Sequence, residues 1–402
     1  MAVVHRHTQW LDTYGPTSWD PYDFWATPVA RRAKAVYYRD ARRGLALVAP
    51  FVLLDAVVPS SRAIVWHRQR FATSDAHYAM AFCLLAQLDG RKGLIRALPF
   101  LEALVEERCP GEDDYCWGYP FDWETCFGTW PAGTPLITCT PYGYEAFEAA
   151  FELTGAQECL AIMESVGRFA FTRIGGVEVA PGVKASTYSP LDRRRVVNAS
   201  AYRGYLLVTA GTRFGHDDWV DEGRATIAYV VRSQQGDGSW LYALDGKDAF
   251  VDNFHTCFVL KSLEKVRRLL GDDALAPVIA RGYAFYKSHL LDEAGLPLPF
   301  ARAQRMTLQR RDLYDYAEGV NLAVLLAGAD NEASTIADTL VKDLLAHWIL
   351  PDGHFVTRQT VFGRNTVPYH RWAQSQAFRA LVTYALVATK ERGEARRVLG
   401  SR

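Results

Sequence analysis

Apolar segments with helical spacing recur along the chain at intervals of about 54 to 67 residues, and each follows a turn rich in Gly, Pro or polar residues. The segments are apolar around most of their circumference and rich in Ala and Gly, which predicts helices that are buried on several sides and closely packed. We expect them to be inner helices of a ring. The six segments begin near Ser74, Thr140, Asn198, Asp252, Asp315 and Arg371.

More charged, amphipathic segments lie between the apolar ones and predict a second, outer layer of helices. Six outer and six inner helices are the number needed for an (α/α)6 toroid, an all-α fold of six helical hairpins with little β structure. We expect one such domain over residues 1–402, with a helical extension over residues 1–40; the best strand candidate is 176–180. The predicted outer helices span 42–57, 94–108, 156–173, 219–232, 273–291 and 331–350.

The inner helices of such a toroid run in one direction, so their N-termini gather on one face. Free backbone N–H groups and the positive end of each helix dipole favour polar and anionic groups there. Polar side chains near each start are expected to cap the first turn. The sequence therefore predicts a pocket on this face, with the preceding loops as its rim.

Composition excludes several classes of protein. Lys and Arg number 45, as do Asp and Glu, so no basic surface for nucleic acid is expected. No apolar run is long enough to predict an integral membrane segment. The basic stretch from Arg31 to Arg43 is interleaved with apolar residues and predicts a solvated helix face, with a membrane-surface role as the alternative. Seven scattered Cys and no secretion signal predict reduced thiols and a cytoplasmic location; the oligomeric state stays open.

The loop 115–124 combines five aromatic residues with two carboxylates just before an inner helix. Aromatic faces can stack on sugar rings, and carboxylates can bind hydroxyl groups or move protons. Asp122 and Glu124 are therefore catalytic candidates, while Trp117, Tyr119 and Trp123 are candidates for substrate binding. The alternative is a structural loop packed on the mouth of the toroid.

Asp252 and His255 lie three residues apart at the start of an inner helix, so they can share one face. A His–Asp pair at a helix N-terminus can act as general acid or base, and both residues are catalytic candidates. Arg371 can bind a carboxylate or phosphate through two parallel hydrogen bonds. The other substrate-binding candidates at these helix starts are Tyr142, Asn198, Tyr202, Asn253, Asp315, Trp372 and Gln374.

The stretch Gln234–Trp240 and the similar Asp352–Phe355 each follow a predicted outer helix. In both, an Asp-Gly pair suits a turn in which Gly takes a positive φ, and the aromatic residue can pack back on the ring. We interpret these turns as structural elements of the repeat, of a type that also recurs in triterpene cyclases.

Several motifs, taken together, resemble a bacterial family found with exopolysaccharide and glycan biosynthesis genes. Its members often carry the names aminolevulinate dehydratase or prenyltransferase-like. The resemblance spans nearly the whole chain and implies an (α/α)6 fold shared with carbohydrate-active lyases, hydrolases and epimerases; it assigns no catalytic residue. The motifs are Asp20-Pro21-Tyr22-Asp23, Cys116-Trp117-Gly118-Tyr119-Pro120-Phe121-Asp122-Trp123, Gly133-Thr134-Pro135, Asn198-Ala199, Gln235-Gly236-Asp237-Gly238-Ser239-Trp240 and Asp252-Asn253-Phe254-His255-Thr256.

His255-Thr256-Cys257 is also similar to the zinc-binding segment of protein prenyltransferase β subunits. In that family an Asp-x-Cys pair lies a little upstream, whereas here Asp114-Tyr115-Cys116 lies far away on another loop. We therefore expect neither a metal nor a cofactor.

Three functions remain open. The first is an enzyme acting on a glycan or uronate-containing saccharide by hydrolysis, β-elimination or C5 epimerisation. The second is an isoprenoid enzyme related to terpene cyclases or prenyltransferases, although the Asp-x-Asp-Asp motif of the protonating cyclases is absent. The third is a non-catalytic glycan-binding toroid within a biosynthetic assembly. The polar residues expected at the pocket mouth favour the first.

Overall fold

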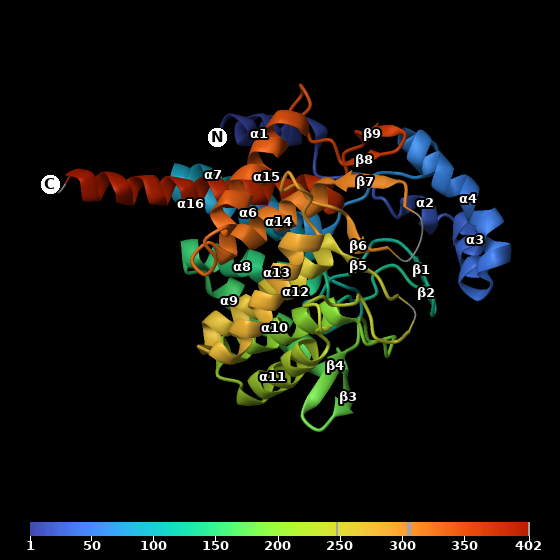
Figure 1. Cartoon of the computed structure of the whole chain (residues 1–402), viewed down its shortest axis with the longest axis horizontal. Coiled ribbons are helices and arrows are strands. Elements are labelled where there is room, and N and C mark those ends of the chain that lie inside the picture. The colour runs from blue at the N-terminus through green and yellow to red at the C-terminus, as the bar shows by residue number, and fades with distance from the viewer. Residues whose placement is uncertain (247, 304–306, 401–402) are drawn as a thin grey trace.

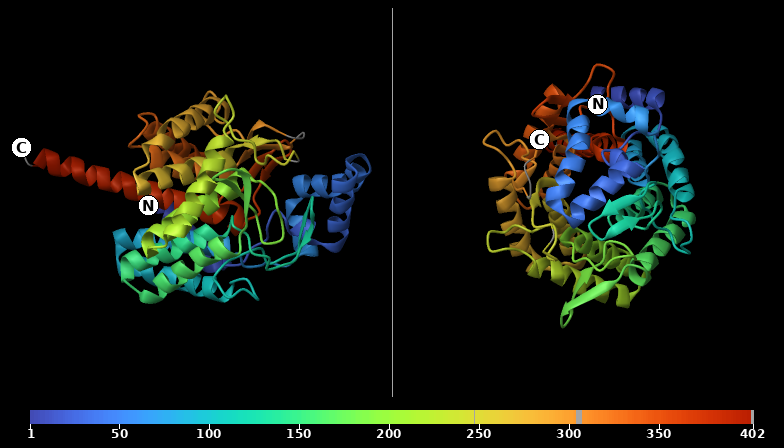
Figure 2. Two further views of the ribbon diagram at one scale, coloured as in Figure 1. Left: turned by 90° about the horizontal axis from the view of Figure 1, so that it is seen from below. Right: turned by 90° about the vertical axis from the view of Figure 1, so that its right-hand side faces the viewer.

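Two concentric layers of helices form a closed toroid in the computed structural model, which describes residues 1–246, 248–303 and 307–400 (Figures 1 and 2). Each inner helix packs against the next, and α16 packs against α6 to close the ring. The (α/α)6 toroid predicted from the repeat is confirmed. The inner helices are α6 (Ala72–Asp89), α8 (Thr140–Thr154), α10 (Val197–Phe214), α12 (Asn253–Leu270), α14 (Leu313–Leu326) and α16 (Ser375–Gly400).

Five outer helices follow inner helices in the chain, within a few residues of the predicted bounds. The sixth outer position is taken by α1, whose His7 ring stacks on Phe355 and Phe378. The extension expected over residues 1–40 therefore contributes its first helix to the ring. The outer helices are α7 (Arg91–Glu106), α9 (Gln157–Thr172), α11 (Asp217–Arg232), α13 (Ala276–His289), α15 (Ala333–His347) and α1 (Ala2–Tyr14).

The segment 42–57 is helical, but its prediction as an outer helix is wrong. It belongs to α4 (Ala41–Val57), which packs against α3 (Pro28–Arg39) in a hairpin that projects from one face of the ring (Figure 2). The short helices α2 (Asp23–Ala26), η1 (Pro59–Ser61) and α5 (Arg62–Val65) flank this hairpin. The apolar spacing of α4 predicted a helix correctly, while the choice of packing partner depends on contacts distant in sequence.

Short strands border the face where the inner helices begin. The predicted strand 176–180 is confirmed as β3 (Gly176–Ala180), paired with β4 (Val183–Ser186). Three further antiparallel groupings were not predicted, because each strand is too short to show alternation. They are β1 (Trp123–Thr125) with β2 (Gly128–Trp130), β5 (Val251–Asp252) with β6 (Phe300–Arg302), and β7 (Gln309–Asp312), β8 (Arg358–Thr360) and β9 (Gly363–Asn365) in one sheet.

Side-chain capping of the inner helices was mostly predicted wrongly. Only α14 has such a cap among the inner helices as described, in which Asp312 accepts from the N–H of Tyr314. The first N–H groups of α10, α12 and α14 instead donate to backbone carbonyl oxygens of Tyr242, Pro299 and Thr357, at 2.9, 3.1 and 3.0 Å. Neighbouring loops thus satisfy the helix starts, which leaves the polar side chains there available for other contacts.

The two predicted structural turns are confirmed. Gly238 and Gly353 have φ values of 92° and 102°, which suit glycine. Trp240 is buried, donates from Nε1 to the carbonyl oxygen of Val230 at 2.9 Å, and lies against Gly282 of α13. The turn therefore connects the outer helix α11 with α13 of the next hairpin.

Candidate functional site

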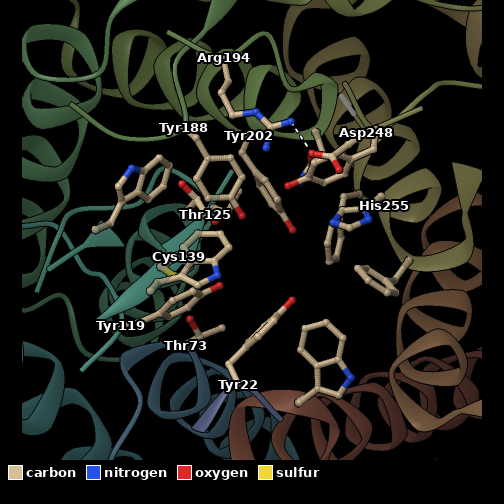
Figure 3. A pocket seen from close by; sticks show the side chains of 18 of the residues that line it. Tyr22, Thr73, Tyr119, Thr125, Cys139, Tyr188, Arg194, Tyr202, Asp248 and His255 are labelled. Atoms are coloured by element: carbon tan, nitrogen blue, oxygen red, sulfur yellow. Dashed lines mark hydrogen bonds and ion pairs between the residues drawn. The ribbon is translucent and has the colours of Figure 1, made fainter. Parts of the chain in front are cut away.

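A cavity of about 240 Å³ lies where the inner helices begin, as predicted. Eight of the predicted site residues line it and more than half of its lining residues are aromatic. Figure 3 shows hydroxyl groups of Tyr22 and Tyr202 directed into its interior. The eight predicted residues are Tyr119, Trp123, Tyr142, Asn198, Tyr202, His255, Arg371 and Trp372.

His255 lies on the cavity wall beside its carboxylate partner. Its Nδ1 lies 2.7 and 2.9 Å from the two carboxylate oxygens of Asp252, which is buried at the end of β5. A carboxylate accepts hydrogen bonds, so Nδ1 donates to Asp252, and Nε2 is the ring nitrogen left to exchange a proton with a ligand. No described residue forms a hydrogen bond with Nε2. This is the arrangement of an imidazole prepared to accept a proton from a ligand.

A second cavity of about 490 Å³ continues from the first. Asp252 and Arg358 line only the second cavity, whereas His255 and Trp372 line both. The imidazole therefore stands at the junction of one extended cleft. Other residues shared by the two cavities are Tyr22, Asp248, Phe250 and Phe254.

Two arginines line the first cavity, and carboxylates neutralise both. Arg371 forms two 2.7 Å hydrogen bonds with Asp20. Arg194 binds Asp245 at 2.9 Å and Asp248 at 2.6 Å, the second contact being the dashed line in Figure 3. Neither guanidinium presents an uncompensated charge to a ligand. The two parallel hydrogen bonds that Arg371 was predicted to offer a ligand carboxylate or phosphate are thus made to Asp20.

Several tyrosines line the first cavity. The hydroxyl groups of Tyr142 and Tyr202 hydrogen-bond to each other. Burial raises the pKa of both phenols well above the usual value, so they remain protonated near neutral pH. The buried Oδ1 of Asn198 has no hydrogen-bond partner in the described part of the chain. These groups can orient hydroxyl groups of a ligand.

Two of the predicted catalytic carboxylates lie outside both cavities, so the expectation that they share a depression with His255 needs correction. Asp122 forms an ion pair with Arg31 of α3 and accepts from the N–H of Ala132, and these contacts lower its pKa. Glu124 is buried and binds the hydroxyl group of Thr129 on β2. Asp122 therefore connects the loop before β1 to α3, whereas Glu124 connects β1 to β2.

Four predicted binding residues also lie outside the cavities. Trp117 donates to the carbonyl oxygen of Leu104 at 2.8 Å, and Gln374 pairs with the backbone of Phe355 at 3.0 and 2.7 Å. Asn253 donates to the carbonyl oxygens of Leu290 and Leu298 at 2.9 and 3.1 Å. Asp315 is fully buried, and its carboxylate has no hydrogen-bond partner in the described part of the chain. Burial, followed by the charges of Asp312 and Asp252, raises its pKa well above the usual value.

Most of the lining residues that the sequence analysis missed lie in loops without periodicity, whereas Tyr314 lies in the first turn of α14. The Arg193–Arg195 run directly before α10 was a usable signal for Arg194, since it precedes a predicted inner helix. Tyr22 belongs to the Asp20–Asp23 motif, in which no residue was predicted to line the site. The principal missed residues are Tyr22, Tyr188, Arg194, Tyr242, Asp248, Phe250 and Tyr314.

The described residues contain no group of three or more His, Cys, Asp or Glu that could hold a metal ion. Cys257 lies buried beside Asn253, while Asp114 binds Ser165 and Arg168 at the outer layer. The two halves of the prenyltransferase-like zinc motif are therefore on different elements.

Comparison of structures identifies the fold. No protein-family model and no curated protein matches the sequence. The cellobiose 2-epimerase of Bacillus thermoamylovorans superimposes with a TM-score of 0.64 at 9% identity, over 80% of this chain and 90% of that chain. An unsaturated glucuronyl hydrolase specific for heparin gives 0.61 at 12% identity over 96% of both chains, and a D-mannose isomerase gives 0.60 at 14% over 80% and 87%. The chain shares the (α/α)6 toroid of these proteins.

Proposed function

We propose that the protein is a carbohydrate-active enzyme that transfers a proton at a carbon atom of a saccharide bound in the aromatic cavity. The observation that carries this proposal is the His255–Asp252 pair, whose free Nε2 stands at the junction of the two cavities. Epimerisation, isomerisation and β-elimination all begin by removal of such a proton. The proteins that share this fold include an epimerase and an isomerase.

The cavity favours proton transfer over hydrolysis by two carboxylates. Glycoside hydrolysis commonly uses two Asp or Glu residues on either side of the scissile bond. Among the described residues, three carboxylates line the two cavities, and each already has a partner. Asp248 binds Arg194, Asp252 binds His255, and Asp55 binds Arg62. Asp122 and Glu124 have other partners outside the cavity. An imidazole base is therefore the best-placed catalytic group.

The substrate class follows from the same contacts. Aromatic rings can stack on the C–H faces of sugars, while tyrosine hydroxyl groups and Asn198 can bind sugar hydroxyl groups. Asp side chains neutralise both arginines of the first cavity, so these two residues favour a neutral saccharide over a uronate; Lys34 of α3 also lines this cavity. We also extend the proposal to glycan biosynthesis in the cytoplasm, on the resemblance of the motifs and the scattered free cysteines.

Solvent deuterium exchange tests the chemistry whichever product forms. Neutral aldoses, reducing disaccharides and uronate-containing oligosaccharides would be incubated with the enzyme in D2O and followed by NMR. We expect deuterium at one sugar carbon. His255→Ala should lower its rate by about 10²- to 10⁴-fold, the usual contribution of general acid–base catalysis.

The matched control is His216→Ala, which removes an imidazole bound to Glu164 on the outer layer at 2.9 Å. This variant should retain the wild-type exchange rate. Hydrolysis without deuterium incorporation would contradict the proposal, as would unchanged exchange in folded His255→Ala. Saccharide binding with no turnover in any member of the panel would favour a binding protein.

A further inference from the structure

The α3–α4 hairpin forms one side of the cleft and projects away from the ring (Figure 2). Lys34 and Tyr38 of α3 line the first cavity. Val52, Asp55 and Ala56 of α4 line the second. One side of the hairpin thus faces the proposed site, and its other side faces outward around the openings of the cleft.

The outward side of α4 is more apolar than the solvent-facing side of a helix on a protein surface usually is. Its sequence is apolar around most of the circumference, a property of buried helices, yet only Gly44 and Val48 are buried. Leu45 and Val57 are 58% and 56% exposed, and Ile64 of α5 is 86% exposed. Exposed large apolar side chains gathered on one short segment of the chain indicate an interaction surface.

Exposed large apolar side chains concentrate on this face of the molecule. Of the 22 found among the described residues, ten lie between Val29 and Val65. Phe127, at the β1–β2 turn, and Val361 and Phe362, at the β8–β9 turn, add to them; Figure 1 shows both turns on the same side as the hairpin. The apolar surface is therefore a rim around the cleft.

Positive charge accompanies the apolar rim. Residues 28–65 contain seven Lys or Arg and two Asp, although the whole chain has equal numbers of acidic and basic residues. Arg32, Arg39, Arg42 and Arg43 are exposed on α3 and α4. Apolar side chains flanked by arginines suit the interface of a bilayer that contains anionic lipids. A symmetric contact between two copies would instead bring the same arginines together.

We propose that this basic, apolar rim docks the mouth of the cleft on an anionic lipid bilayer. No single helix in the described ranges is long and apolar enough to cross a membrane. The pair formed by Ala41–Val57 and Pro59–Val65 has suitable length and composition, but its two parts are bent by 107°. Such a bent apolar surface inserts into the interfacial region of one leaflet. Docking would present the cleft to saccharides carried by membrane molecules, a consequence that rests on the proposed function.

Vesicle co-sedimentation of the full chain tests the docking. Phosphatidylcholine vesicles would be compared with vesicles in which about 30% of the lipid is phosphatidylglycerol, which supplies the anionic surface. We expect binding to the anionic vesicles that weakens with added salt. Arg42→Gln and Arg43→Gln should each weaken binding roughly fivefold, and the double variant Leu53→Glu/Leu54→Glu should weaken it by more than about tenfold.

The matched control is Ile95→Glu/Leu98→Glu, which adds the same charges at exposed apolar positions of α7 on the outer layer. It should bind as the wild type does. Failure of the folded wild type to bind anionic vesicles would overturn the proposal, as would equal loss in the control. A concentration-dependent dimer that Leu53→Glu/Leu54→Glu abolishes, without vesicle binding, would assign the rim to a second copy instead. Deuterium exchange on soluble saccharides is a separate measurement, so docking and chemistry can fail independently.

Discussion

Arg371 lies in the π-helical turn His370–Gln374, just before the last inner helix, and forms a buried bidentate ion pair with Asp20, 351 positions away in sequence, with both N–O distances at 2.7 Å. Asp20 lies just before α2, so the pair joins the N-terminal segment to the pocket wall. The guanidinium also lies over the rings of Tyr22 and Tyr119. A residue suited by chemistry to bind a substrate anion is thereby used to assemble the site.

Removing one charge of this pair should destabilise the protein strongly. Asp20→Asn leaves a buried guanidinium without its counter-charge, and we expect the free energy of unfolding to fall by about 3 to 5 kcal/mol. Arg371→Gln should cost a similar amount, and the double variant less than the sum of the two. Urea unfolding of the four proteins measures the coupling.

Asp12→Asn provides the matched control. Asp12 also binds an arginine through two hydrogen bonds, to Arg96 at 2.7 and 2.9 Å, but both side chains are about half exposed. Its substitution should cost less than about 1 kcal/mol. Equal effects of Asp20→Asn and Asp12→Asn would contradict the structural role of the buried pair.

Acid should weaken the attachment of α1 to the ring. Burial lowers the pKa of His7 from 6.5 to about 3, so the folded protein holds a neutral imidazole there. The unfolded chain binds this proton below pH 6.5, whereas the folded chain does not until about pH 3. The stabilisation is therefore complete above pH 6.5 and is lost as the pH falls toward 3.

His7→Phe tests this pH dependence because it keeps an aromatic ring among Trp10, Phe355 and Phe378. Between about pH 7 and pH 5, the wild type should lose about 2 kcal/mol more unfolding free energy than this variant. Urea titrations at the two pH values give the comparison. An identical loss in the wild type and in His7→Phe would rule out a contribution from His7.

Gly143→Ala should disturb the packing of α8 against Trp117. A Cβ at this position would lie 2.2 Å from the ring of Trp117, which is buried and hydrogen-bonded to Leu104. Relief requires movement of the indole or of the helix, and we expect a cost of about 1 to 3 kcal/mol in thermal or urea unfolding. Gly236→Ala is the control, since a Cβ there meets no atom within 4 Å. Equal stability of the two variants would show that Trp117 adapts freely.

The tyrosine pair is expected to position the ligand rather than to act as a base. Because the pKa values of Tyr142 and Tyr202 are raised by burial, their hydroxyl groups donate hydrogen bonds near neutral pH. Tyr202→Phe removes one of these groups and should raise KM for the active saccharide by roughly tenfold, with a smaller change in kcat. A loss confined to kcat, or a shifted pH profile, would instead indicate proton transfer by Tyr202.

The local sequence was enough to predict the helices and their order along the chain. The spacing of apolar residues placed the six inner helices within a few residues of their observed starts, because helical periodicity is a property of neighbouring residues. It also placed His255 beside Asp252, since positions three apart share a helix face. The turn that contains Gly238 and Trp240 was predicted because the residues that form it are close together in sequence.

Only the tertiary structure decided which groups meet. Both α1 and α4 have apolar residues at helical spacing. The first of them completes the ring through the contacts of His7 with Phe355 and Phe378. The second packs against α3 in the hairpin that projects from the face of the ring where the cavity opens. Asp122 lies in the loop before one inner helix and His255 in the first turn of another. His255 lines the cavity, whereas Asp122 lies outside it in an ion pair with Arg31. Such choices depend on contacts between residues tens to hundreds of positions apart, whose energies a local pattern does not contain.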